Sequence, residues 1–209
     1  MNKLFVFGCS FTHGNGCLPN EVYTQRYKKS ENDLIWPEYV SKKLNLKLFN
    51  FGKGAVGNDY IIDTIMQNFD LIDEGDVVII EKTFSHRFDI CTKTDDGNEV
   101  WETITPTSEF ILKEKGYSKN DIIPLIHTLS IIDSDLNNDR WIERFEFFKK
   151  IIGMHKKAKC CIVWDLESGY HIKYERIVDV DNSINDKHWS FKGHRMFAEE
   201  ILEKIKNYE

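Results

Sequence analysis

Residues 4–14 read Leu4-Phe-Val-Phe-Gly-Cys-Ser-Phe-Thr-His-Gly14, and the rest of the fold can be predicted outward from them. Leu4–Phe7 is a short continuous apolar run, which is typical of a parallel β-strand buried on both faces. A turn containing Gly8, Cys9 and Ser10 follows at once. In open parallel sheets, ligands and catalytic groups gather beyond the carboxyl ends of the strands, and the first strand is normally central. Ser10 therefore lies where chemistry is expected.

Four more apolar runs predict the remaining strands: Lys47–Phe51, Val77–Glu81, Lys159–Trp164 and Arg176–Val180. Segments with apolar residues at helical spacing alternate with these runs and predict helices over about Asp33–Leu44, Asn58–Phe69, Trp141–His155 and Gly193–Tyr208. Asp33 is placed to cap the first of these helices. Strand–helix alternation along the whole length predicts a single α/β domain, residues 1–209, built as a three-layer α/β/α sandwich around a parallel sheet.

Residues 84–140 interrupt this alternation and predict an insertion over or beside the site. Phe88–Lys93 and Glu99–Thr105 flank a turn at 95–98, which favours a β-hairpin. We also expect a helix near Ile122–Ile132. The aromatic residues of the insertion could stack on sugar rings, although a small core of their own is the stronger expectation.

Composition and charge exclude several classes of protein. The 209 residues carry a net charge of −6, and no basic cluster suits nucleic-acid phosphates. The first residues run directly into a strand and no apolar run is long enough to span a membrane, so we expect a cytoplasmic protein without membrane partners. The five cysteines are odd in number and lack metal-ligand spacing, which indicates neither a disulfide framework nor a metal site.

Ser10 alone allows three interpretations. It could form a turn or a helix cap with Gly8. It could join Thr12, Gly14 and Gly16 in a phosphate cradle, as in a flavodoxin-like nucleotide or flavin binder. It could also be a catalytic nucleophile, and a general base elsewhere in the chain would favour this third interpretation.

Asp186-Lys-His188 supplies such a base, immediately before the last predicted helix. A serine hydroxyl becomes a good nucleophile when an imidazole takes its proton, and a carboxylate fixes the tautomer of that imidazole. Taken alone, Asp186 and His188 could equally form a solvated turn. His194 follows inside the first turn of the helix, where a structural role is favoured, and its spacing from His188 does not suit zinc.

Together these motifs resemble the SGNH (GDSL-like) serine hydrolase superfamily. Its first block, Gly-Asp-Ser after the first strand, matches Gly8-Cys9-Ser10 with Cys9 in place of the usual Asp. Its last block, an Asp and a His before the last helix, matches Asp186 and His188. The resemblance implies a flavodoxin-like five-stranded parallel sheet in the order 2-1-3-4-5, with Ser10, Asp186 and His188 as the catalytic residues.

The same resemblance implies an oxyanion hole. The second block corresponds to Asn50–Asn58, where Gly54 is the first choice for a backbone N–H donor beside that of Ser10, and Gly57 the second. Asn58 could add a side-chain donor or simply cap the next helix. The third block departs from the family, because Glu81–Arg87 contains no asparagine. Either Asn58 or Thr83 replaces that residue, or the hole is weaker, or the activity has been lost.

The expected activity is hydrolysis of an ester through an acyl-serine intermediate, with a small acyl group such as acetyl on a carbohydrate as the family theme. Transfer of the acyl group to a sugar hydroxyl is the related possibility. The resemblance implies no cofactor and a small-molecule or glycan ester as the partner, and a homo-oligomer is possible. Two alternatives stay open: a catalytically inactive SGNH-fold or flavodoxin-like binding or assembly protein, and a reactive thiol at Cys9 in place of Ser10.

Overall fold

The computed structural model describes residues 1–15, 17, 33–93, 96–97, 99–105, 118, 134–156, 158–174, 176–177 and 188–208. Within these residues, a parallel sheet has the order β2-β1-β3-β6, formed by β1 (Lys3–Gly8), β2 (Lys47–Gly52), β3 (Val77–Lys82) and β6 (Cys160–Asp165). The first strand is central, as predicted. The sheet order agrees with the first four positions of the expected 2-1-3-4-5 arrangement.

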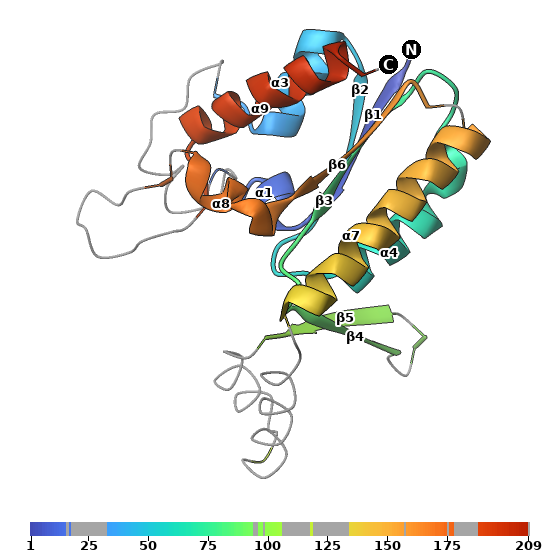
Figure 1. Ribbon diagram of the computed structural model, residues 1–209, viewed down its shortest axis with the longest axis vertical. Coiled ribbons are helices and arrows are strands. Elements are labelled where there is room, and N and C mark those ends of the chain that lie inside the picture. Colours follow the sequence, from blue (N-terminus) through green and yellow to red (C-terminus); the bar gives the residue numbers. More distant parts are fainter. Residues whose placement is uncertain are drawn as a thin grey trace.

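Helices cover both faces of the sheet, which confirms the three-layer α/β/α prediction (Figure 1). One face carries α3 (Trp36–Leu44) and α9 (Phe191–Lys206), and the other carries α4 (Asn58–Gln67) and α7 (Ser134–Ile151). The short elements are α1 (Ser10–His13), η1 (Phe69–Leu71), the π-helix η2 (Ile152–Lys156), η3 (Leu166–Ser168) and α8 (Tyr170–Lys173). None of the described helices is long and apolar enough to cross a membrane.

The two central strands are buried on both faces, which explains their continuous apolar sequences. Leu4, Phe5 and Val6 of β1 are completely buried, and every residue of β3 is buried. Burial of this apolar area is the main favourable contribution to folding. Helix α3 begins at Trp36 rather than near Asp33, because Pro37 suits the first turn and the Ile35 N–H donates to Glu38 Oε2 at 3.2 Å. Asp33 therefore does not cap it.

The insertion contains the predicted hairpin. β4 (Phe88–Lys93) and β5 (Glu99–Ile104) pair antiparallel as a separate two-stranded sheet beside the first turn of α7 (Figure 1). The helix expected near 122–132 lies outside the described residues. Helix α7 begins at Ser134, seven residues before the predicted start at Trp141, so it takes in the last part of the 84–140 interval. Its first turns are polar and lack the apolar spacing on which the prediction rested.

The predicted fifth strand, Arg176–Val180, requires a correction. Arg176 forms an isolated antiparallel bridge with Trp189, and the Ile177 N–H donates to the His188 carbonyl at 3.0 Å. Ile177 is buried with Cys17, Ile35 and Phe191 instead of entering the sheet beside β6. Residues 178–180 lie outside the described part of the chain. Among the described residues, β6 is therefore an edge strand.

Candidate active site

Ser10 is the first residue of α1 and stands directly beyond the carboxyl end of the central strand. Its side chain is nearly buried, with 4 % of the residue exposed, and its hydroxyl lies 3.8 Å from Cys9 Sγ. Two glycines that contact this turn, one before it in the chain and one in β2, cannot be replaced by larger residues without a clash. A Cβ on Gly8 would lie 2.3 Å from Glu81 Oε2, and a Cβ on Gly52 would lie 2.5 Å from the backbone nitrogen of His13. Sterics thus fix where α1 begins relative to the strands.

The predicted oxyanion-hole donors are two backbone N–H groups. Those of Ser10 and Gly54 have no hydrogen-bond acceptor among the described residues. The Gly57 N–H, the second choice for the oxyanion hole, donates instead to Asp89 Oδ1 at 2.8 Å. The Gly54 loop lies against the end of α1, since a Cβ on Gly54 would be 2.7 Å from Asn15 Nδ2. Of the two predicted glycine donors, only Gly54 is therefore uncommitted.

Asp89 explains how the hairpin supports this loop. Its carboxylate accepts the Gly57 N–H at 2.8 Å, the Tyr60 N–H at 2.9 Å and the Thr103 hydroxyl at 2.6 Å. The Trp101 ring of β5 also packs edge-to-face on Tyr60, with centroids 5.8 Å apart. The hairpin thus caps the first turn of α4 and anchors the loop that contains Gly54.

His188 lies beside the turn that carries Ser10. Its ring centroid is 5.1 Å from that of Phe11, the residue after Ser10, and Phe11 also packs on Trp189 at 4.9 Å. Ser190 begins α9 by accepting the Gly193 N–H at 3.2 Å. His188, which is far from Ser10 in sequence, therefore packs on the residue that follows Ser10. Asp186, the predicted third member, lies outside the described residues.

His194 is buried and has a structural environment. Its Nδ1 accepts the Trp36 N–H at 3.4 Å, which links α9 to the start of α3. Burial, assisted by the nearby His188, lowers the pKa of His194 to about 3. His194 is consequently neutral at physiological pH and contributes packing between the two helices.

Asn58 is buried and is bonded to the end of β3. Its Oδ1 accepts the Thr83 N–H at 2.9 Å, and its Nδ2 donates to the Thr83 carbonyl at 3.2 Å. The Thr83 hydroxyl in turn accepts from Arg87 Nη1 at 3.2 Å. Gly57, rather than Asn58, occupies the cap position of α4. Asn58 and Thr83, the two residues expected to replace the missing asparagine, are thus hydrogen-bonded to each other at the carboxyl end of β3.

A buried carboxyl group that sequence reasoning missed lies next to Ser10. Glu81 of β3 is completely buried and accepts from the Cys9 N–H at 3.0 Å, Cys9 Sγ at 2.7 Å and the Thr12 hydroxyl at 2.5 Å. Burial raises the pKa of the Glu81 carboxyl. Burial and the neighbouring Glu81 raise the pKa of the Cys9 thiol to about 12, so this thiol stays protonated. The only sequence signal for Glu81 is a charged residue at the end of an apolar run.

A second buried charge joins β3 to β6. Lys82 is completely buried and forms ion pairs with Asp165 at 2.9 Å and Glu167 at 2.7 Å. The Ser85 hydroxyl also donates to Glu167 at 2.7 Å. Burial acts to raise the pKa of the Glu167 carboxyl, but the hydrogen bonds from Lys82 and Ser85 outweigh it and the pKa is lowered. These ion pairs and hydrogen bonds connect the carboxyl ends of β3 and β6 next to Thr83.

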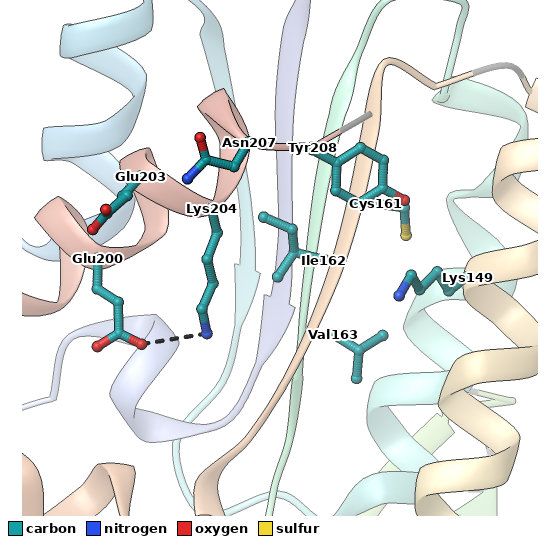
Figure 2. A pocket seen from close by; sticks show the side chains of 9 residues that line it. All are labelled: Lys149, Cys161, Ile162, Val163, Glu200, Glu203, Lys204, Asn207 and Tyr208. Carbon is teal, nitrogen blue, oxygen red and sulfur yellow. Dashed lines mark ion pairs between the residues drawn. The ribbon is translucent and has the colours of Figure 1, made fainter.

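A cavity of about 450 Å³ lies away from Ser10, along β6 between α7 and α9 (Figure 2). Cys161, Ile162 and Val163 form its floor, and Lys204 forms an ion pair with Glu200 at 3.3 Å on one wall. None of the predicted site residues lines it. The described residues contain no group of three or more His, Cys, Asp or Glu side chains that could hold a metal ion.

The fold and the site define an α/β protein whose central parallel strand presents a serine at its carboxyl end. No protein-family model matches the chain, and no curated protein matches it in sequence. Among solved structures, the chain is similar to a protein from Desulfitobacterium hafniense DCB-2 that is assigned to the lipolytic G-D-S-L family. The sequence identity is 14 %, the TM-score is 0.33, and the match covers 98 % of this chain and 99 % of that chain. A likeness at this level supports no conclusion about activity.

Proposed function

We propose that the protein is a serine hydrolase that cleaves an ester through an acyl-serine intermediate, with Ser10 as nucleophile and His188 as general base. One observation carries the proposal. Ser10 stands at the carboxyl end of the central strand, and His188, from the other end of the chain, packs 5.1 Å from the adjacent Phe11 ring. Parallel-sheet enzymes gather their catalytic groups at this edge.

The proposed reaction has two steps. His188 takes the proton of Ser10 Oγ as the hydroxyl attacks the ester carbonyl, and it returns the proton to the departing alcohol when the ester C–O bond breaks. Water then attacks the acyl-serine carbonyl while His188 accepts a proton from the water. The bond between the acyl carbon and Ser10 Oγ breaks, the carboxylic acid leaves, and His188 returns the proton to Ser10 Oγ. Asp186 is proposed to orient the imidazole and to stabilise its charged form.

The oxyanion formed in each step would accept hydrogen bonds from the Ser10 and Gly54 backbone N–H groups. Both are without an acceptor among the described residues, as a preformed oxyanion hole requires. One such donor typically contributes about 3 kcal/mol to transition-state stabilisation. Asn58 is assigned a supporting role, since its hydrogen bonds hold Thr83 at the edge of the site.

Cys9 is not a rival nucleophile in this proposal. Its side chain is completely buried, its thiol donates to Glu81 Oε1 at 2.7 Å, and its pKa is raised to about 12. A thiol attacks as the thiolate, and this environment suppresses the thiolate. The adjacent Ser10 is the nucleophilic side chain.

The proposed substrate carries a small acyl group, such as acetyl, on a carbohydrate or similar alcohol. Acyl transfer to a sugar hydroxyl would use the same acyl-serine, with the hydroxyl replacing water in the second step.

Hydrolysis of 4-nitrophenyl acetate tests the proposal. We expect turnover by the wild-type protein, loss of turnover in Ser10→Ala, and a large decrease in His188→Ala. A Cys9→Ala variant should still turn over the ester, at a rate reduced by the loss of the thiol hydrogen bond to Glu81, and thereby separates the two adjacent side chains. Turnover that persists in Ser10→Ala would refute the nucleophile assignment. No turnover on short acyl esters, together with tight binding of a flavin or nucleotide, would favour a binding protein instead.

A further inference from the structure

The proposed mechanism leaves one buried titratable group beside the nucleophile without a function. Glu81 has no exposed surface, and burying a carboxyl group is costly unless its oxygens are hydrogen-bonded. In this protein both oxygens have partners, and all of the partners come from one short segment. Oε1 accepts from Cys9 Sγ, whereas Oε2 accepts from the Cys9 N–H and the Thr12 hydroxyl.

The three donors lie on either side of Ser10. One carboxyl group therefore holds the residue before the nucleophile by its backbone and its side chain, and the residue two positions after it by its hydroxyl. Glycine at position 8 makes this approach possible, because a Cβ there would lie 2.3 Å from both Glu81 Oε2 and Thr12 Oγ1. Strand β1, strand β3 and the Ser10 turn are thus interlocked at a single carboxyl group.

The identity of residue 9 fits the same arrangement. Cys9 is the residue before α1, and its side chain makes no capping hydrogen bond to the helix. The family that the sequence resembles has an Asp at this position, whereas here the carboxyl group comes from the neighbouring strand. Arg87 is the charged residue that acts on Glu81 from nearby. Its charge opposes the rise in the pKa of Glu81, and its Nη1 donates to the Val56 carbonyl at 3.0 Å and to Thr83 Oγ1.

We propose that Glu81 is a positioning residue for the nucleophile: its carboxyl group fixes the Cys9–Thr12 turn, so that the Ser10 hydroxyl and the Ser10 N–H both face the substrate. The inference rests on the proposed function. Glu81 does not touch substrate. It acts through the turn, by removing alternative orientations of Ser10 that a less constrained turn would adopt.

Glu81→Gln is the most informative variant. It keeps the volume and one acceptor oxygen, but its amide nitrogen cannot accept the hydrogen bonds made to the second oxygen. We expect Glu81→Gln to slow fluorophosphonate labelling of Ser10 by roughly tenfold or more, as is common when a catalytic group is displaced by about 1 Å. Turnover of 4-nitrophenyl acetate should fall through kcat, with little change in KM.

A matched control separates positioning from general stability. Asp76 is also a buried carboxyl group that accepts backbone N–H groups, from Lys3 at 2.7 Å and Asp73 at 2.9 Å, but it lies at the opposite end of the sheet. Asp76→Asn should lower the thermal unfolding temperature while leaving the labelling rate of folded protein unchanged. Equal labelling rates in Glu81→Gln and wild type would overturn the inference and leave the proposed function standing.

Thr12→Val gives a second test if Glu81→Gln does not fold. It removes one donor at nearly constant volume, so labelling should slow by a smaller factor than in Glu81→Gln. Where both variants fold, the double variant should lose less than the sum of the two single losses, because both changes weaken the same hydrogen-bonded turn. An additive loss, or no loss in Thr12→Val, would contradict the inference.

Hydrogen exchange provides a readout that does not depend on activity. In Glu81→Gln the peptide spanning residues 8–15 should exchange faster than in wild type, whereas peptides from β2 should not change. Unchanged exchange in residues 8–15 would overturn the positioning role. Absence of labelling in the wild-type protein would refute the proposed function itself, and the positioning role with it.

Discussion

Gly8→Ala is the perturbation whose effect can be worked out most directly from the structure. The added methyl group would lie 2.3 Å from Glu81 Oε2, 2.3 Å from Thr12 Oγ1 and 2.7 Å from Glu81 Cβ. The carboxyl group cannot move aside cheaply, because it is completely buried and accepts three hydrogen bonds. Overpacking of this kind costs typically about 1–3 kcal/mol, and one displaced buried hydrogen bond adds about 1–3 kcal/mol. We therefore expect the free energy of unfolding to fall by about 2–6 kcal/mol.

Gly153→Ala is the matched control. Gly153 lies in η2 and is exposed, and a methyl group added there would have no neighbouring atom within 4 Å. Alanine restricts the unfolded chain and favours helix, so this change should stabilise the protein by about 0.5–1 kcal/mol. Urea unfolding of both variants and the wild type, with unchanged m-values, measures the difference. Gly8→Ala as stable as wild type would refute the packing described for the Ser10 turn.

Three further predictions concern other parts of the site. Asn58→Ala should lower the free energy of unfolding in urea by about 2 kcal/mol, because the buried Thr83 N–H loses its acceptor while Lys82 Nζ still donates to the Thr83 carbonyl at 3.3 Å. An unchanged free energy of unfolding would show that the hydrogen bonds between Asn58 and Thr83 do not stabilise the fold. Burial lowers the pKa of His194 from 6.5 to about 3, so its neutral form stabilises the fold fully above pH 6.5, and this contribution declines as the pH falls toward 3. Between pH 7 and pH 5 the wild-type free energy of unfolding should therefore fall by about 2 kcal/mol more than that of His194→Gln. An equal fall in both proteins would show that folding does not lower the pKa of His194. Asp89→Ala should lower the kcat of the proposed ester hydrolysis and raise hydrogen exchange at the start of α4, since the Gly57 and Tyr60 N–H groups lose their acceptor. Equal exchange in variant and wild type would show that the hairpin does not anchor the Gly54 loop.

The part of the fold that could be predicted from sequence is the part in which burial dictates composition. Strands β1 and β3 are buried on both faces, so their apolar runs are visible without any structural knowledge. The strand predicted at Arg176–Val180 is wrong at Arg176 and Ile177, because that prediction also rested on an apolar run alone. An apolar run also results when a segment packs beside the last helix, as Ile177 does against Phe191, and periodicity does not distinguish the two environments.

The pairing of Ser10 with His188 stays a prediction, and it rests on the residue types that the chemistry requires. Ser10 and His188 could be paired because a nucleophile needs a base, and the structure places His188 against the neighbour of Ser10. Glu81 and Asn58 could not be found in this way. Their partners are set by the register that places Gly8 of β1 beside Glu81 of β3, and by the contact of α4 with the Thr83 turn. Those contacts exist only after the chain has folded.

Mass spectrometry after reaction with a fluorophosphonate tests the central claim most directly. We predict one covalent adduct per chain, located on Ser10 by peptide mapping, absent in Ser10→Ala and formed much more slowly in His188→Ala. An adduct on any other residue, or equal labelling of Ser10 in wild type and His188→Ala, would contradict the proposed catalytic pair.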